Sequence, residues 1–103
     1  MQSSREIGEI KKIYGENDFR LASIFKVLGD INRFRIVLSL IKETNLRVGV
    51  IAKVIDMSLP SASQHLKALE LNGVLLKARR GKQVYYSLNR GNKNVKSIIK
   101  TLN

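Results

Sequence analysis

The sequence predicts a mainly α-helical fold with a small β-hairpin, built from about six helices and a two-stranded wing. Two short helical segments, about 48–55 and about 59–71, are separated by only a few residues, which is the spacing of a helix-turn-helix. Two strand-like segments, Val74 to Leu76 and Val84 to Tyr86, follow the second of these helices. The segment 77–83 between the strands is rich in Lys and Arg. Together these observations predict a winged helix-turn-helix.

The totals are those of one folded domain. The chain has 103 residues, which is close to the usual size of a single domain. Hydrophobic residues make up 44% of it, and its one proline leaves no proline-rich linker to divide it. We therefore expect one winged helix-turn-helix domain over residues 1–103. The lack of cysteine excludes disulfides and thiolate metal sites.

The first half of the chain predicts three helices. Ser3 and Glu6 have the spacing of a capping box, which opens the first helix. Asp18 is suited to cap a second helix that runs from Phe19 to Leu28. A third helix is expected from about Ile31 to Lys42. The apolar stripe that this third helix buries is expected to contain Phe34, Val37, Leu38 and Ile41.

The helix at about 59–71 has the clearest boundaries. Ser58 can cap it, and Pro60 is tolerated only in a first turn, so the two residues define its start. Asn72 and Gly73 accept the left-handed conformation that ends a helix. The spacing of the apolar residues predicts one buried stripe, formed by Ala62, Leu66 and Leu69.

Amphipathic helices are also predicted at both ends of the chain. A helix of about ten residues is not stable alone in water, so each must cover its apolar side. We predict that the two helices form a homodimer interface; the alternative is that they pack on their own subunit. The apolar residues are Ile7, Ile10 and Tyr14 in the first helix, and Val95, Ile98, Ile99 and Leu102 in the last.

The charge of the chain favours a polyanionic partner. Lys and Arg number 19 against 8 Asp and Glu, a formal net charge of +11. Residues 61–103 alone carry nine basic side chains and one acidic side chain. Such an asymmetric field favours nucleic acid first and an anionic membrane surface second, and the neutral alternative is that the charge only keeps the protein soluble.

No membrane partner is expected. No apolar run approaches the ~20 residues that span a bilayer, and the first residues have no continuous apolar core of a signal peptide. We therefore expect a cytoplasmic protein.

The sequence contains no recognisable catalytic constellation. It has no glycine-rich phosphate loop, no plausible pair of carboxylates and no nucleophile beside a base. His65 is the single histidine, and it flanks the buried stripe of its helix. We expect it to make a structural hydrogen bond rather than to bind a metal. An enzyme is not expected.

Three segments occur together at the spacing of one known family. They are Phe25-Lys26-Val27-Leu28-Gly29-Asp30 with Arg33-Phe34-Arg35-Ile36, then Leu59 to Leu69, and then Gly73-Val74-Leu75 with the wing from Arg80 to Leu88. Through them, about two thirds of the chain resembles the ArsR/SmtB family of winged-helix transcriptional regulators. The resemblance implies a homodimer that binds an operator and usually represses transcription, and from which a ligand releases the DNA.

The chain departs from that family at both of its metal sites. Where many members have L-C-V-C-D-L, this chain has Leu46-Arg47-Val48-Gly49-Val50-Ile51, so Arg47 and Gly49 stand at the cysteine positions. Other members place zinc ligands along the last helix, which here offers lysines and no ligand. We therefore expect no metal site and no cofactor.

The DNA-contacting residues are predicted from chemistry and position. Ser61, Gln64 and Lys67 lie off the buried stripe, where Gln suits adenine and Lys suits guanine or phosphate. Ser63 lies at the margin of that face and matches a family serine, and Ser58 suits a phosphate at the helix start. In the wing, the residues expected on phosphate or in the minor groove are Arg79, Arg80 and Lys82; Arg47 is a weaker candidate.

We therefore expect a sequence-specific DNA-binding transcriptional regulator, a repressor that binds an inverted-repeat operator in double-stranded DNA as a homodimer. The helix at about 59–71 is expected in the major groove, and the wing at 77–83 on the backbone or in the minor groove. One alternative is a nucleic-acid-binding or architectural protein without sequence preference. Another is a winged helix that binds only protein.

Overall fold

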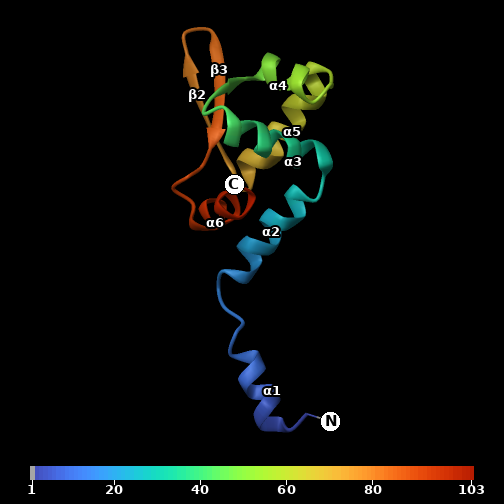
Figure 1. Ribbon diagram of the computed structural model, residues 1–103, viewed down its shortest axis with the longest axis vertical. Helices are drawn as coiled ribbons and strands as arrows, with labels where there is room; N and C mark the ends of the chain where they lie inside the picture. The colour runs from blue at the N-terminus through green and yellow to red at the C-terminus, as the bar shows by residue number, and fades with distance from the viewer. Residues whose placement is uncertain (1) are drawn as a thin grey trace.

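The computed structural model describes residues 2–103, which contain six helices and a three-stranded antiparallel sheet (Figure 1). The elements in chain order are α1 (Ser4–Lys11), α2 (Asp18–Leu28), α3 (Ile31–Lys42), β1 (Leu46–Arg47), α4 (Val48–Val54), α5 (Leu59–Leu71), β2 (Leu75–Arg80), β3 (Gln83–Leu88) and α6 (Lys93–Leu102). The predicted winged helix-turn-helix fold is confirmed, with one strand more than the sequence indicated.

Side-chain caps define where four of the helices begin. Each capping side chain accepts a hydrogen bond from a backbone N–H two or three residues further on, which satisfies a donor that the helix itself leaves free. The expected caps at the starts of α1 and α5 are confirmed. The four capping residues are Ser3, Asp30, Ser58 and Asn92.

The predicted cap of α2 is wrong. Asp18 is the first residue of this helix, and Asn17 occupies the capping position without a side-chain hydrogen bond to the helix. The Asp18 carboxylate instead accepts a hydrogen bond at 2.9 Å from the backbone N–H of Gly15. Asp18 therefore closes the turn that precedes α2.

The hydrophobic core lies between α2 to α6 and the base of the sheet. Its fully buried members come mainly from α3, α4 and α5, and α1 contributes none of them. In α3 the buried residues are Ile36, Val37 and Leu40, so of the predicted stripe only Val37 is confirmed as buried. Leu38 is 40% exposed, and Phe34 and Ile41 are half-buried, because α3 is rotated relative to the sequence-based expectation.

The wing is longer than the sequence indicated. β2 and β3 pair from Leu75 opposite Leu88 to Arg80 opposite Gln83, so only Gly81 and Lys82 connect the strands. Gly81 has a φ of 62°, a left-handed conformation that suits a two-residue hairpin turn. The third strand, β1, pairs with β3 through just two residues, which gives a strand order of β1-β3-β2.

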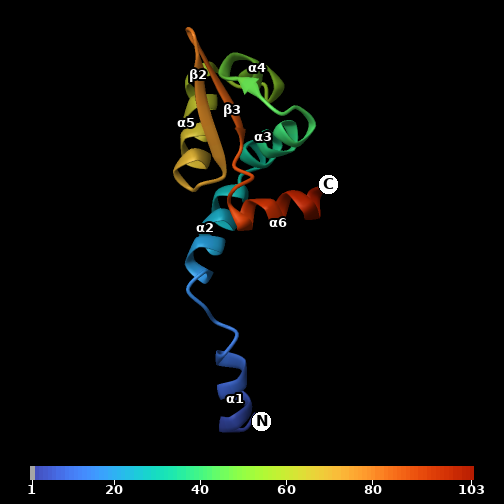
Figure 2. The same cartoon turned by 90° about the vertical axis from the view of Figure 1, so that its left-hand side faces the viewer.

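Two asparagines hold the start of α6 beside the start of α2. The Asn17 side-chain amide donates to the Asn94 side-chain oxygen at 2.9 Å, and the Asn94 amide donates back at 3.1 Å. Asn94 is only 9% exposed, so both of its bonds lie in a poorly hydrated place, where they stabilise most. This pair places the start of α6 beside α2, from which α6 extends sideways in Figure 2.

α1 projects away from the rest of the molecule. The radius of gyration is 17.0 Å, whereas a compact chain of this length has about 13 Å. The long dimension of 60 Å arises because α1 and the wing lie at opposite ends (Figures 1 and 2). None of the helices within residues 2–103 has both the length and the apolar character of a bilayer span.

The cap of α3 gives a pH-dependent prediction. The hydrogen bond from the backbone N–H of Arg33 holds the pKa of Asp30 below its ordinary value of 3.8, against the opposing effect of burial. A lowered pKa means that the carboxylate stabilises the fold above its unfolded-state pKa, and that this contribution is lost as the pH falls through the folded-state value. We expect Asp30→Ala to reduce the free energy of unfolding by about 1 kcal/mol near neutral pH.

Urea unfolding between about pH 7 and about pH 3 measures this effect, and the difference between the two proteins should shrink toward the acid end. Asp30→Asn is the matched control, because an amide oxygen still caps a helix but does not titrate. An Asp30→Asn variant as unstable as Asp30→Ala would contradict the capping role.

Candidate nucleic-acid interface

The outward face of α5 follows from what this helix buries. Ala62, Leu66 and Leu69 are each 0% exposed, so the rotation of the helix about its axis is determined by the core. The opposite face is open to solvent along the whole helix. Pro60, Gln64, Lys67 and Leu71 lie on that face, and Leu59 and Ser63 are exposed at its margin.

The structure divides the five predicted contact residues of this region into two groups. Ser63, Gln64 and Lys67 are exposed on the outward face. Ser61 is half-buried, and its hydroxyl oxygen accepts a hydrogen bond at 3.0 Å from the Ser58 hydroxyl. Ser58 also accepts from the backbone N–H of Ser61 at 3.3 Å. Ser58 and Ser61 therefore hydrogen-bond to each other at the start of the helix. The side chains of Ser63, Gln64 and Lys67 make no such bond and extend into solvent.

The predicted wing cations lie at and next to the turn of the hairpin. Arg79 and Arg80 are the last two residues of β2, and Lys82 is in the connection to β3. The Arg80 guanidinium lies 5.2 Å from the centre of the Tyr85 ring, a cation–π arrangement that orients it along the wing. Lys77 approaches the Glu70 carboxylate at 3.6 Å.

The pairing of Lys77 with Glu70 leaves residues 61–103 strongly basic. Glu70 is the single acidic residue after position 60, and Lys77 approaches it. The other eight basic residues of 61–103 have no acidic residue within that segment to offset their charge.

At the base of the wing, burial raises the pKa of Tyr86, so its phenol is neutral.

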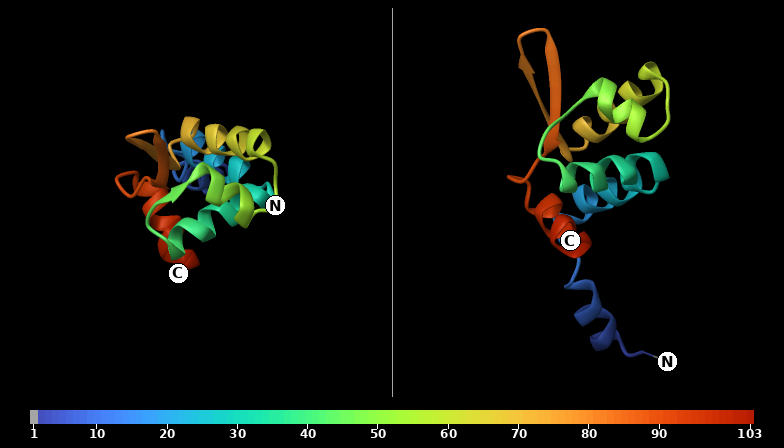
Figure 3. Two further views of the ribbon diagram at one scale, coloured as in Figure 1. Left: turned by 90° about the horizontal axis from the view of Figure 1, so that it is seen from above. Right: turned by 45° about the horizontal axis from the view of Figure 1, so that its top comes forward.

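α5 and the wing lie at the same end of the molecule, and α1 lies at the other end (Figure 3). Arg47, the weaker candidate, is exposed in β1 opposite Tyr85 of the wing. It borders a hollow of about 190 Å³ together with Lys53 of α4 and Gln83 of β3. Lys53 and Gln83 were not predicted from the sequence, because only the packing of α4 beside β3 brings them next to Arg47.

His65 makes the structural hydrogen bond that the sequence predicted. Its Nδ1 accepts from Arg33 Nε at 3.2 Å, and Arg33 Nη1 donates to the Val27 carbonyl oxygen at 3.2 Å. One side chain of α3 thereby connects the end of α2 with the middle of α5. The described part of the chain contains no cluster of three His, Cys, Asp or Glu residues that could hold a metal.

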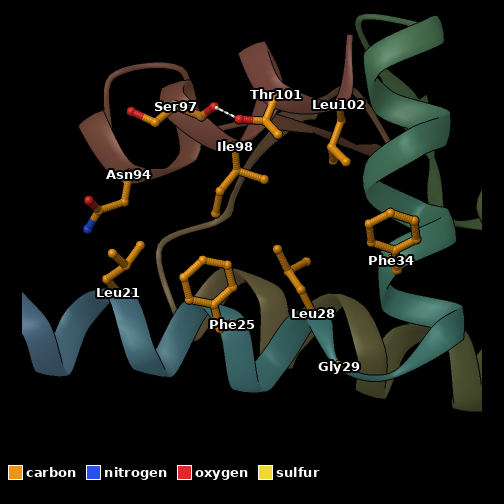
Figure 4. A pocket seen from close by; sticks show the side chains of 10 residues that line it. All are labelled: Leu21, Phe25, Leu28, Gly29, Phe34, Asn94, Ser97, Ile98, Thr101 and Leu102. Atoms are coloured by element: carbon orange, nitrogen blue, oxygen red, sulfur yellow. Dashed lines mark hydrogen bonds between the residues drawn. The ribbon is translucent and has the colours of Figure 1, made fainter.

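A second surface, an apolar groove, lies between α2 and α6 (Figure 4). Its volume is about 480 Å³. Leu21, Phe25 and Leu28 of α2 point into it from one side, and Ile98 and Leu102 of α6 point into it from the other. Phe25 is 60% exposed, which is a large apolar area for a single side chain to leave in water.

α6 divides its residues among three faces. Val95 and Ile99 are 2% and 5% exposed in the core of their own subunit, so they have almost no surface left for a partner. Ile98 and Leu102 face the groove, and the third face is formed by Lys93, Lys96 and Lys100. Of the four residues of α6 predicted at a homodimer interface, only Ile98 and Leu102 are therefore accessible to a partner.

The predicted contact residues of the first helix are all accessible. Ile7 is 45%, Ile10 51% and Tyr14 66% exposed. Tyr14 lies beyond the end of α1, in the turn that leads to α2. α1 does not pack on its own subunit, which was the alternative, because no residue of α1 is buried.

Comparisons with known proteins place these features among bacterial transcriptional regulators. No family model matches the chain. The cadmium resistance transcriptional regulatory protein CadC of Listeria innocua is 41% identical over 78 residues, 76% of this chain. The matched part is 62% of the CadC length, so the chain spans less than two thirds of that relative. The transcriptional repressor PagR of Bacillus anthracis is 36% identical over 83 residues, 80% of each chain.

Solved structures agree with this placement. The crystal structure of PagR superposes with a TM-score of 0.68, and the alignment covers 80% of this chain and 91% of PagR at 35% identity. The homodimeric winged helix-turn-helix DNA-binding domain of Mb0332 from Mycobacterium bovis, a possible ArsR-family transcriptional regulator, superposes with a TM-score of 0.71. That alignment covers 98% of this chain and 83% of Mb0332 at 25% identity.

The Arg33 connection gives a prediction about stability. Arg33→Met keeps the aliphatic part of the side chain but leaves His65 Nδ1 and the Val27 carbonyl without this donor. We expect the free energy of unfolding to fall by about 1–3 kcal/mol, the usual cost of an unsatisfied, partly buried polar group.

Arg35→Met is the matched control, because Arg35 is exposed on the same helix and its substitution removes the same charge. We expect it to change stability by less than about 0.5 kcal/mol. Chemical denaturation of the three proteins measures both effects, and equal losses in the two variants would show that Arg33 acts only through its charge.

Proposed function

The chain belongs to the ArsR family of winged-helix transcriptional regulators, and we propose that it is a sequence-specific repressor. In this proposal a homodimer binds an inverted-repeat operator in double-stranded DNA. α5 enters the major groove, and the wing contacts the backbone or the minor groove.

The observation that carries this proposal is the outward face of α5 beside the basic wing. The core presents Ser63, Gln64 and Lys67 on one face of a helix, at the end of the molecule where the wing also projects. Gln64 can donate to and accept from an adenine, and Lys67 can donate to a guanine or a phosphate. Ser63 is suited to either kind of contact.

The phosphate contacts are assigned to the exposed cations around that helix. Arg79 and Lys82 extend from the wing, and Arg80 is oriented by Tyr85. Arg47 and Lys53 line the hollow beside β3 and are placed to extend the same basic surface. Ser58 and Ser61 remain candidates for contact, but each would first have to give up the hydrogen bond that it makes to the other.

The homodimer is proposed to form through α1 and the groove between α2 and α6. α1 exposes Ile7 and Ile10, and a helix of eight residues is not stable alone in water. The groove offers apolar surface of matching character, and we propose that α1 of a second copy of this chain occupies it. The homodimeric state of the Mycobacterium bovis domain supports a pairing of this kind.

The cadmium-related name of one relative is not extended to this chain. Soft metal ions such as cadmium prefer thiolate ligands, and the sequence has no cysteine. The proposal therefore assigns no metal and no cofactor, and it concerns DNA binding and dimerisation alone.

Selection of binding sites from random duplexes tests the proposal directly. A repressor of this kind should enrich an imperfect inverted repeat whose half-site centres are about one or two helical turns apart. Binding without enrichment of any sequence would instead support an architectural role, and no binding to duplex DNA would leave only a protein-binding role.

Salt titrations of variants separate base contacts from phosphate contacts. Removing one phosphate contact from each subunit, by Arg79→Ala or Lys82→Ala, should reduce the slope of log affinity against log salt by about two for the dimer. Gln64→Ala should leave this slope unchanged and relax the preference at one position of each half-site. A smaller slope for Gln64→Ala than for Lys82→Ala would reverse these assignments.

Dimerisation is tested by placing a charge in the groove. Phe25→Glu should leave the monomer folded, because Phe25 is already 60% exposed, but it should shift the protein to monomers at micromolar concentration. Phe19→Glu is the matched control, since Phe19 lies on the same helix, is 86% exposed and is outside the groove. Sedimentation analysis distinguishes the two states, and a dimer that survives Phe25→Glu would place the interface elsewhere.

A further inference from the structure

The first turn of α5 presents hydrocarbon, rather than hydrogen-bond donors, to the solvent. Leu59 is the first residue of the helix and is 54% exposed, and the exposed Pro60 follows it. Leu59 is neither a member of the hydrophobic core nor one of the partly buried residues that pack against it. α5, which begins at Leu59, lies at the opposite end of the molecule from α1. Neither the core nor the proposed dimer contact therefore explains this exposed leucine.

The polar groups of this turn are already satisfied. The backbone N–H of Ser61 donates to Ser58 Oγ at 3.3 Å, and the N–H of Ala62 donates to the Ser58 carbonyl oxygen at 2.9 Å. The Ser58 hydroxyl donates to Ser61, and Pro60 has no N–H. A helix start usually offers several N–H groups to a phosphate, but here only that of Leu59 is left.

We propose that Leu59, supported by Pro60, contacts the 5-methyl group of a thymine in the major groove and makes each operator half-site specific for that base. This inference rests on the proposed function, because it requires α5 to lie in the groove. The first residues of the second helix of a helix-turn-helix are the ones that meet base edges. Thymine is the base that presents a methyl group there, and an apolar side chain is its natural partner.

The helix geometry also places this thymine relative to the other contacts. Leu59 is five residues before Gln64, which is about 7.5 Å along the helix axis. Successive base pairs are about 3.4 Å apart along the DNA axis. The thymine should therefore lie about two base pairs from the position that Gln64 contacts.

Deoxyuridine substitution tests the proposal, since uracil pairs like thymine but lacks the 5-methyl group. In the operator obtained by selection, each thymine of a half-site is replaced in turn, and the affinity of the full-length protein is measured. At one position the loss should be about four-fold, the effect of about 0.8 kcal/mol for one methyl group removed from an apolar contact. Replacement in both half-sites should give the square of that loss.

Leu59→Ala assigns the effect to this side chain. The variant should bind the unmodified operator more weakly, and it should no longer distinguish thymine from uracil at that position. Leu71→Ala is the matched control, because Leu71 is a 76% exposed leucine at the other end of α5. It should keep the full four-fold effect, and the circular dichroism of both variants should equal that of the parent.

The outcomes separate this inference from the function on which it rests. A selected operator in which no thymine methyl matters, or in which Leu59→Ala keeps the same uracil penalty, overturns the role of Leu59 and leaves the repressor proposal intact. Failure to select any operator overturns both. A uracil penalty that disappears only in Leu59→Ala supports the thymine contact.

Discussion

The complete burial of Ala62, Leu66 and Leu69 fixes the orientation of α5 in the domain. These side chains leave α5 a single rotation about its axis, because any other would expose a leucine and bury a lysine or a glutamine. The same packing therefore stabilises the domain and decides which residues face outward. No other element is needed to orient the exposed side chains of α5, because the core packing already fixes the helix.

Local features of the fold were predictable from the sequence, and features created by packing were not. The cap at Ser58 and the first-turn Pro60 depend on residues close in sequence, and the structure has both. β1 has two residues and exists only because β3 passes beside it, so no periodicity could indicate it. The hydrogen bond between Arg33 and His65 joins residues 32 positions apart, and it likewise depends on the tertiary fold.

The same distinction explains the corrections to the candidate sites. Helical spacing placed Val95, Ile98, Ile99 and Leu102 on one apolar side, but the reciprocal bonds between Asn17 and Asn94 set the side of α6 that meets α2. That side is divided between core and groove, which spacing alone cannot reveal. Helical spacing also predicted that Ser61 would be exposed. In the structure Ser61 is half-buried, and its hydroxyl accepts a hydrogen bond from Ser58.

The domain thus presents two surfaces of different chemistry. The groove is apolar and is lined by α2 and α6, whereas the wing and the exposed face of α5 are rich in basic residues. Arg33 hydrogen-bonds to the last turn of α2 through the Val27 carbonyl and to α5 through His65. A shift of α2 when a second copy occupies the groove would strain one of these two bonds unless α5 moved with it. Because packed interiors deform little, the simplest result is that the two helices move as one body. In the dimer proposed here, the groove contact would then also set the spacing between the two copies of α5, and with it the half-site spacing of the proposed operator.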